Sequence, residues 1–132
     1  MTNMIEIEDL PISAEFLREK RLIQERGELA LIEDGKTFKH LGYFSLKKGL
    51  QYFRGGHYHK KKIECFYIIS GELLVQLVDV ESMERREITL KKGQKVRIYP
   101  MCAHKFSAIQ DSQVIEYYNS PYDPDDDIKF NF

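Results

Sequence analysis

Three residues in one short segment of this chain have the types and spacing of a divalent-metal site. His57 and His59 are two residues apart in the stretch RGGHYHKKKIEC, and Glu64 follows five residues after His59. Alternate residues of a β-strand point to the same face, so the two imidazoles can face one interior. Imidazole nitrogens and carboxylate oxygens are ligands for zinc, iron, manganese and nickel in proteins. We therefore expect a divalent metal at this segment.

The lysines between His59 and Glu64 bear on whether these two side chains can meet. Glu64 lies an odd number of residues after His59, so one continuous strand would turn it to the opposite face. Lys60–Lys62 are typical of an exposed hairpin tip, and a turn there resets the phase. His104 is the expected fourth ligand, because a proline and small residues just before it predict a bend that opens a new strand. His40 has no partner at a comparable spacing.

The elements that must position these side chains are short β-strands. After residue 27, runs rich in Val, Ile, Tyr and Phe alternate with turn signals at intervals of about 8–12 residues, among them Gly55-Gly56, Ser70-Gly71 and Asp111-Ser112. The runs are GELALIED, KHLGYFSL, CFYIIS, LLVQLVDV, REITL, QKVRIYP, HKFSAI and QVIEYY. This pattern predicts an all-β barrel or sandwich. Residues 13–25 predict a short helix or an irregular arm. Phe130 and Phe132 should pack the acidic tail over the barrel without forming a strand, with the tail aspartates facing solvent.

Length and composition predict one domain with no charge-driven partner. The 132 residues divide into an N-terminal arm (1–27), a barrel (about 28–120) and a tail (121–132). A net charge of −1 gives no electrostatic case for nucleic acid or an anionic membrane. No apolar run approaches the roughly 20 residues of a membrane span, and the acidic N-terminus is unlike a signal peptide. We expect a cytoplasmic protein with reduced thiols at Cys65 and Cys102, and Cys102 should be a small buried thiol rather than a nucleophile.

The histidine segment resembles the first motif of the cupin family. The matching pattern is Gly56-His57-x-His59-x4-Glu64-x6-Gly71, which is complete here. A second stretch resembles the second cupin motif through Gly93, Pro100 and His104, with Cys102 and Ala108 in place of the usual glycine and asparagine. The resemblance covers roughly residues 40–120. It implies a double-stranded β-helix, or jelly-roll barrel, with a pocket at its centre.

A narrower resemblance concerns activity. Arg54-Gly55-x-His57-Tyr58 is similar to the dTDP-4-dehydrorhamnose 3,5-epimerase superfamily, in which the arginine contacts a nucleotide-sugar and the histidine is a base. The wider pattern resembles the sugar-nucleotide 3,4-ketoisomerases. It also resembles cupin domains of capsular-polysaccharide biosynthesis reductases, in which such a site holds zinc. The resemblance implies an isomerase or epimerase acting on a sugar.

Such a reaction removes a proton next to a carbonyl, which needs a base, an acid and a grip on the substrate. His57 is the candidate base and Tyr58 a candidate proton donor. Arg54, Arg97 and Tyr99 are candidate substrate-binding residues, because arginine binds diphosphates through paired hydrogen bonds. If His57 and His59 bind metal, neither is free as a base, so ligation and acid–base catalysis are competing hypotheses for His57.

Two other functions fit the same residues. Three histidines and a glutamate also suit Fe(II) or manganese, and open coordination positions would make the protein a dioxygenase. Alternatively, the barrel binds a metal or ligand without catalysis. Cupin resemblance and the exposed edge strands of small barrels lead us to expect a homodimer.

Overall fold

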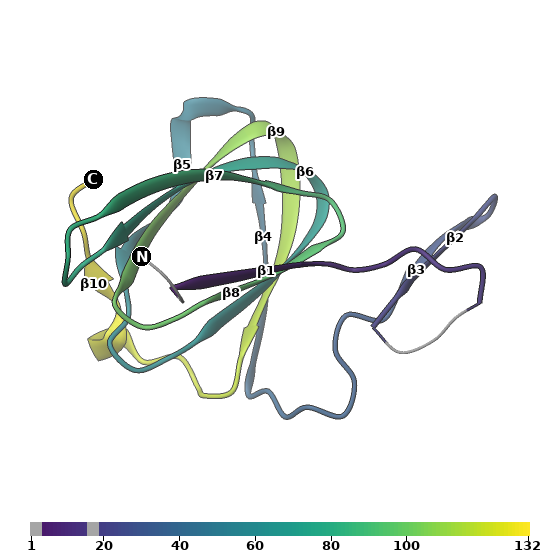
Figure 1. The fold of residues 1–132 in the computed structure, drawn as a ribbon, viewed down its shortest axis with the longest axis horizontal. Helices are drawn as coiled ribbons and strands as arrows, with labels where there is room; N and C mark the ends of the chain where they lie inside the picture. The colour runs from purple at the N-terminus through teal and green to yellow at the C-terminus, as the bar shows by residue number, and fades with distance from the viewer. Residues whose placement is uncertain (1–3, 16–18) are drawn as a thin grey trace.

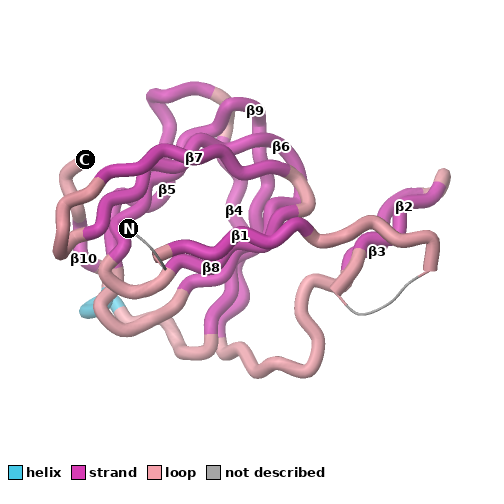
Figure 2. Tube along the Cα trace, viewed as in Figure 1, coloured by secondary structure: helices cyan, strands magenta, loops and turns pink. Residues whose placement is uncertain are grey.

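The computed structural model describes residues 4–15 and 19–132, and its regular structure is almost entirely β-strand (Figure 2). The strands are β1 (Ile5–Asp9), β2 (Arg21–Gln24), β3 (Gly27–Ala30), β4 (His40–Leu46), β5 (Gly49–Tyr58), β6 (Glu64–Asp79), β7 (Arg85–Lys91), β8 (Gln94–Ile98), β9 (Cys102–Tyr118) and β10 (Ile128–Lys129). A 3-10 helix, η1 (Pro124–Asp126), precedes β10. The predicted all-β fold is confirmed.

The two longest strands, β6 and β9, organise the barrel. The main sheet has the order β1-β8-β6-β9-β5-β10, with β4 also paired to β9 and β7 to β6. Both long strands bend where their registers shift, so each contributes to two walls that enclose one interior (Figure 1). Gly71 makes the bend in β6 at φ +90°, where a Cβ would collide with Ser112 and the carbonyl of Asp111 on β9. Expected turns at 70–71 and 111–112 are therefore bends inside continuous strands.

Apolar side chains from alternate positions on these strands fill the interior. The buried core consists of Leu46, Phe66, Ile68, Leu73, Val75, Leu77, Leu90, Val96, Ile98, Cys102, Phe106, Ala108 and Val114. Three aromatic rings, of Phe44, Phe66 and Phe106, pack together with centroids 5.2–6.5 Å apart. Burial of each such ring contributes about 1.5–3 kcal/mol. These rings also adjoin the His104 imidazole, so the polar site sits directly on the aromatic part of the core.

The N-terminal segment forms strands where sequence reasoning predicted an arm or helix. β1 pairs antiparallel with β8, so residues 5–9 of the predicted arm belong to the main sheet. β2 and β3 form a separate hairpin that extends away from the barrel (Figure 1). The helix predicted over 13–25 is wrong for residues 19–25, because Arg21 and Glu28 form a cross-strand ion pair at 2.8 Å and Gly27 adopts φ +134° after the turn. Residues 16–18 lie outside the described part.

The C-terminal tail also forms a strand, contrary to the prediction. β10 pairs with the end of β5, placing Ile128 opposite Tyr58 and Lys129 opposite His57. The backbone N–H of Phe130 donates to the carbonyl of Gly56 at 2.9 Å. A two-residue strand is too short to leave a period of two in the sequence. The Phe130 ring packs edge-on against Tyr58, as expected for the tail.

Candidate metal and proton-transfer site

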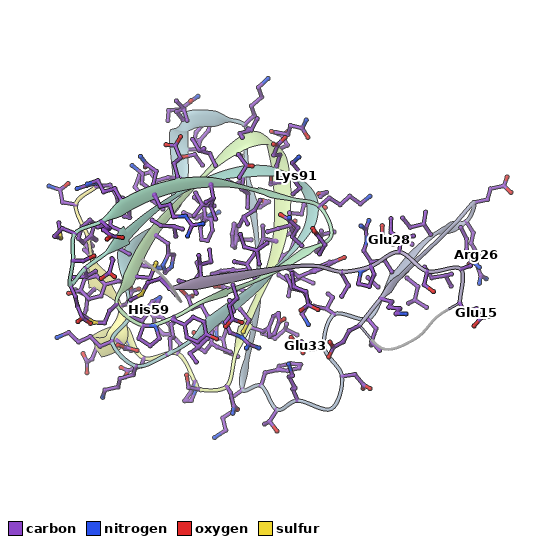
Figure 3. The ribbon with its side chains drawn as sticks, viewed as in Figure 1. Glu15, Arg26, Glu28, Glu33, His59 and Lys91 are labelled. Atoms are coloured by element: carbon purple, nitrogen blue, oxygen red, sulfur yellow. The ribbon has the colours of Figure 1, made fainter. Side chains whose placement is uncertain are left out.

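Four of the predicted residues meet at one end of the barrel interior. We call His57, His59, Glu64 and His104 the central cluster; one ligand atom from each lies within 4.8 Å of the others. They come from β5, the segment after it, the start of β6 and the start of β9. Figure 3 labels His59 at this end of the barrel. Sequence spacing therefore identified residues that the fold brings together, and their role as metal ligands stays a prediction.

A glycine allows the strands that carry the histidines to approach closely. Gly55 has φ +82°, and a Cβ there would lie 2.7 Å from the carbonyl oxygen of His104. The register of β5 against β9 shifts at this point, and His57 then pairs with His104. The Gly55-Gly56 pair, expected to mark a turn, thus lies inside β5 as a bulge that aims His57 at the site.

The Nδ1 atom of each imidazole in the central cluster contacts an oxygen atom of the protein. The contacts run from His57 to the Asp127 carboxylate at 2.7 Å, from His59 to the Asp126 carbonyl at 2.5 Å, and from His104 to the Cys102 carbonyl at 3.0 Å. Partners of this kind fix the tautomer and ring orientation of metal-binding histidines. The Nε2 atom of each ring remains for the centre of the cluster.

The glutamate joins two of these rings. His59 Nε2 and His104 Nε2 lie 2.7 Å and 2.9 Å from the same Glu64 oxygen. The His104 contact lacks hydrogen-bond alignment, so this buried nitrogen has no hydrogen-bond partner among the described residues. Burial acts to raise the pKa of Glu64, but the two imidazoles outweigh it and hold the pKa well below its ordinary value. An ionised carboxylate and an unpaired buried nitrogen at one point fit a divalent cation.

His57 differs from the other members of the central cluster. Its side chain is 24% exposed, whereas those of His59, Glu64 and His104 are at most 5% exposed. Burial, followed by the nearby charge of His104, lowers the pKa of His57 to about 4. His57 is therefore neutral near pH 7 and within reach of a molecule entering the site.

The connection from β5 to β6 is not the hairpin tip predicted at Lys60–Lys62. β9 lies between β5 and β6 in the sheet, so the connection crosses between strands that are not neighbours. Its three backbone N–H groups donate to the carboxylate of Asp126, at 2.7 Å for the shortest contact. Asp126 was expected to face solvent with the other tail aspartates, but it is buried because it satisfies these donors. The Lys62 side chain is buried as well, with Nζ 4.1 Å from the Tyr118 ring centroid.

The predicted substrate-binding residues are not all near the central cluster. Arg54 is exposed, lies over the Phe44 ring at 6.0 Å and donates to the carbonyl of Ser45. Phe44 packs against the aromatic rings beside His104, so Arg54 borders the same end of the interior. Tyr58 alternates with the two histidines and packs on Phe130, so the structure does not bring it to the cluster.

Arg97 and Tyr99 lie on the outer face of the barrel. Their neighbour Ile98 points into the core opposite Glu64, so alternation turns Arg97 and Tyr99 outward. The Tyr99 hydroxyl donates to Glu6 at 2.6 Å, and Arg97 approaches the same carboxylate at 3.7 Å. The structure separates both residues from the central cluster by the thickness of the sheet.

Sequence reasoning missed four polar residues at or beside the site. They are His40, Glu116, Asp126 and Asp127. Glu116 had a signal, because it follows Val114 at the inward phase of an otherwise apolar run. The aspartates gave no such signal within an acidic tail. Cys102, expected to be a buried inert thiol, is fully buried, and burial raises its pKa to about 12.

Comparison with known proteins identifies the family. The sequence pattern of the polysaccharide biosynthesis C-terminal domain matches residues 23–129. The chain belongs to this family. A search of curated proteins found no match.

Solved structures share the fold across nearly the whole chain. QdtA, a sugar 3,4-ketoisomerase from Thermoanaerobacterium thermosaccharolyticum in complex with TDP, is 19% identical with a TM-score of 0.78, covering 100% of this chain and 91% of that one. The WlaRB TDP-quinovose 3,4-ketoisomerase from Campylobacter jejuni is 18% identical with a TM-score of 0.75, covering 98% and 94%. The dTDP-4-dehydrorhamnose 3,5-epimerase from Sulfolobus tokodaii is 22% identical with a TM-score of 0.69, covering 94% and 80%. This polysaccharide-biosynthesis domain thus has the RmlC-like cupin fold.

Proposed function

We propose that this chain is a sugar isomerase or epimerase that transfers protons next to the carbonyl of a nucleotide-linked keto sugar. One observation carries the proposal: a neutral, partly exposed His57 is held by the Asp127 carboxylate at 2.7 Å, with its other nitrogen turned toward the central cluster. A carboxylate behind an imidazole orients it as a base and stabilises the charge that it gains. Solved structures that share this fold, two sugar 3,4-ketoisomerases and a 3,5-epimerase, support the substrate class.

In this proposal His57 is the base and the other three residues of the central cluster hold a divalent metal. His59, Glu64 and His104 are two imidazoles and a carboxylate, a three-ligand set that leaves coordination positions open. When bound, such a metal supplies Lewis-acid polarisation of a carbonyl oxygen. The chain itself positions His57 through Asp127, keeps water away from the buried ligands and offers Arg54 at the border of the site for a phosphate group.

Hydrogen exchange tests the activity directly. The untagged protein is incubated in D2O with dTDP- and UDP-linked 4-keto sugars, and deuterium at the carbons beside the carbonyl is followed by NMR together with product formation. We expect exchange and product with wild type and neither with His57→Ala. A wild-type protein that gives no exchange and no product would exclude the isomerase and epimerase functions for these sugars.

Elemental analysis separates the two roles of His57. We expect near-stoichiometric metal in wild type and in His57→Ala, and loss of metal in His104→Ala. If His57→Ala loses metal as fully as His104→Ala does, His57 is a ligand and the base must be another residue. If wild type stays metal-free after soaking with zinc, iron, manganese and nickel, the metal proposal fails and His59 becomes available for acid–base catalysis.

A dioxygenase is the second candidate, favoured by the donor set of the central cluster. Histidine and carboxylate ligands with open positions are the usual setting for non-haem Fe(II). Iron as the purified metal, together with oxygen consumption on adding a substrate, would support this function. Zinc would count against it, because zinc has no redox chemistry. A barrel that binds metal and shows neither activity would leave the non-catalytic binding role.

We also propose a cytoplasmic homodimer. The β2–β3 hairpin carries Ile23 and Leu29 at 49% and 54% exposure, and such apolar residues on a projecting hairpin support pairing between copies. Light scattering after size-exclusion chromatography tests the dimer, and a monomer at micromolar concentration would contradict it. Within the described residues, no helix has the length and hydropathy to cross a membrane.

A further inference from the structure

A second titratable pair lies in the barrel interior beside the central cluster. Glu116 on β9 is placed between Gly42 of β4 and Phe66 of β6 by the strand registers. Its neighbours Val114 and Phe66 belong to the core, so alternation turns Glu116 inward. The side chain is nevertheless 29% exposed, so an entering molecule can reach it. A carboxylate at an inward position of an apolar strand costs stability, which is typical of a functional group.

His40 on β4 completes the pair. Its ring stacks on Tyr118 with a centroid distance of 4.1 Å and an interplanar angle of 7°. That stack directs Nε2 to 3.8 Å from a Glu116 oxygen, too far for a hydrogen bond. Nε2 is buried and has no hydrogen-bond partner among the residues that the structure describes. These contacts therefore do not explain why the fold keeps Glu116 and His40 side by side in its interior.

The pair depends on the absence of a side chain at one neighbour. A Cβ on Gly42 would lie 2.9 Å from the Glu116 carboxylate and 3.2 Å from His40 Nε2. Gly42 does not need its backbone freedom, because its φ is outside the left-handed range. The glycine therefore provides room at the carboxylate rather than a special backbone conformation.

Two further contacts connect this pair with the central cluster. Lys62 lies with Nζ 4.1 Å from the centroid of Tyr118, which stacks on His40, and 4.0 Å from Glu64. Glu64 precedes Phe66 by two residues, so it shares the inward face of β6 with the residue that is paired to Glu116. Burial, and next the charge of Glu64, raise the pKa of Glu116, which favours its protonated form. Because Glu116 shares this inward face with Glu64, its carboxyl group lies in the same interior as the proposed base.

We propose that Glu116 is a further catalytic residue, which exchanges a proton with the oxygen atoms of the substrate while His57 exchanges protons with its carbon atoms. This assignment rests on the proposed isomerase or epimerase function. His40 is a positioning residue for Glu116.

The chemistry balances without a redox partner. His57 takes the proton from the carbon beside the carbonyl, and the electrons of that C–H bond form a C=C bond. The carbonyl π electrons move to oxygen, which takes the proton of Glu116 and gives an enediol. In a keto shift, the neighbouring hydroxyl returns a proton to Glu116 and its oxygen forms the new C=O bond. The C=C electrons then take the proton from His57 at the original carbonyl carbon. In an epimerisation the enol oxygen returns its proton to Glu116, the carbon takes a proton from a water molecule on the other face, and His57 releases its proton to the resulting hydroxide through solvent.

Glu116→Gln tests the assignment, because it keeps the shape of the side chain and removes the acid. We expect kcat for product formation to fall about 10²- to 10⁴-fold, with metal content and Tm close to wild type. Glu116→Asp should recover part of the rate. His40→Phe keeps an aromatic ring against Tyr118 without the nitrogens, and should lower kcat less than Glu116→Gln. Glu87→Gln, on the exposed strand β7, is the matched control and should leave kcat unchanged.

The outcomes separate this assignment from the proposed function. An active wild type with a Glu116→Gln variant within threefold of its kcat overturns the role of Glu116 and leaves the proposed function standing. A wild type with no exchange and no product on the keto sugars overturns both. A Glu116→Gln variant that loses activity together with its metal or its Tm also overturns the assignment, because Glu116 would then be structural.

Discussion

Replacing Asp126 by alanine should destabilise the protein through a loop more than sixty residues away in the sequence. The carboxylate accepts hydrogen bonds from three consecutive backbone N–H groups, in Lys60–Lys62, at 2.7–3.3 Å. Hydrogen bonds to a charged group contribute about 1.5–3 kcal/mol each. The lysine segment is partly exposed, so water can replace some of the lost acceptors after the substitution. We therefore expect a loss of about 3 kcal/mol in the free energy of unfolding rather than the full sum.

Chemical and thermal denaturation measure this loss. For a chain of this length, the expected change corresponds to a fall of about 10 °C in Tm. Asp126→Asn should fall between wild type and Asp126→Ala, because its amide keeps one oxygen acceptor but no charge. Asp125→Asn is the control. Asp125 is exposed and lies next to Asp126 in the same 3-10 helix, so its substitution should change the free energy of unfolding by less than about 0.5 kcal/mol. An Asp126→Ala protein as stable as this control would refute the reasoning.

The acid dependence gives a second check on Asp126. Burial acts to raise its pKa, but the three backbone hydrogen bonds outweigh burial and place the pKa below its ordinary value of 3.8. A lowered pKa in the folded state contributes stability above the ordinary value, and that stability is lost as the pH falls through the folded-state pKa. The difference in unfolding free energy between wild type and Asp126→Asn should therefore shrink below about pH 3.8. A difference that grows on acidification would have the wrong sign.

Three further predictions concern the site. Gly55→Ala should lower both Tm and metal content, because Gly55 has a left-handed φ and a Cβ there would lie 2.7 Å from the carbonyl oxygen of His104. Differential scanning fluorimetry would measure Tm and elemental analysis the metal content, and unchanged values would contradict the close approach. Asp127→Asn should lower kcat. It should also shift the acid-side fall of kcat with pH to below about pH 4, since Asp127 raises the pKa of His57. A fall at the same pH as in wild type would argue against this pair. Cys102, with a pKa of about 12, should resist iodoacetamide in the native protein at pH 8 and react after unfolding, as mass spectrometry would show.

The sequence predicted the fold class and the central cluster for local reasons. The alternation of His57 and His59, together with the phase of Glu64, needs information from only a few neighbouring residues. The predicted turn at Lys60–Lys62 placed Glu64 on the correct face of its strand, but the structural reason was wrong. A reset of phase was needed, but a crossing connection capped by Asp126 provides it, and no local pattern distinguishes the two.

The remaining parts of the site depend on contacts between distant segments. Asp126 and Asp127 lie in a run of aspartates that looks solvent-facing, and only the pairing of β10 with β5 brings them to the histidines. Arg97 lies away from the central cluster for a simpler reason: its core neighbour Ile98 fixes its outward phase, which alternation in the sequence already indicated. The β2–β3 hairpin was missed because its strands are short and mostly polar.

The late position of β10 has a consequence for the order of folding. Strands β4, β5 and β6 all pair with β9, so the barrel walls cannot close until the ribosome has delivered residues up to Tyr118. Contacts so far apart in sequence make such β-barrels slow to form. The oxygens that orient His57 and His59 belong to Asp127 and Asp126, which follow Tyr118 in the sequence and are synthesised after it. During synthesis the barrel walls can thus be assembled before the histidines are aligned, so the central cluster is completed after the barrel.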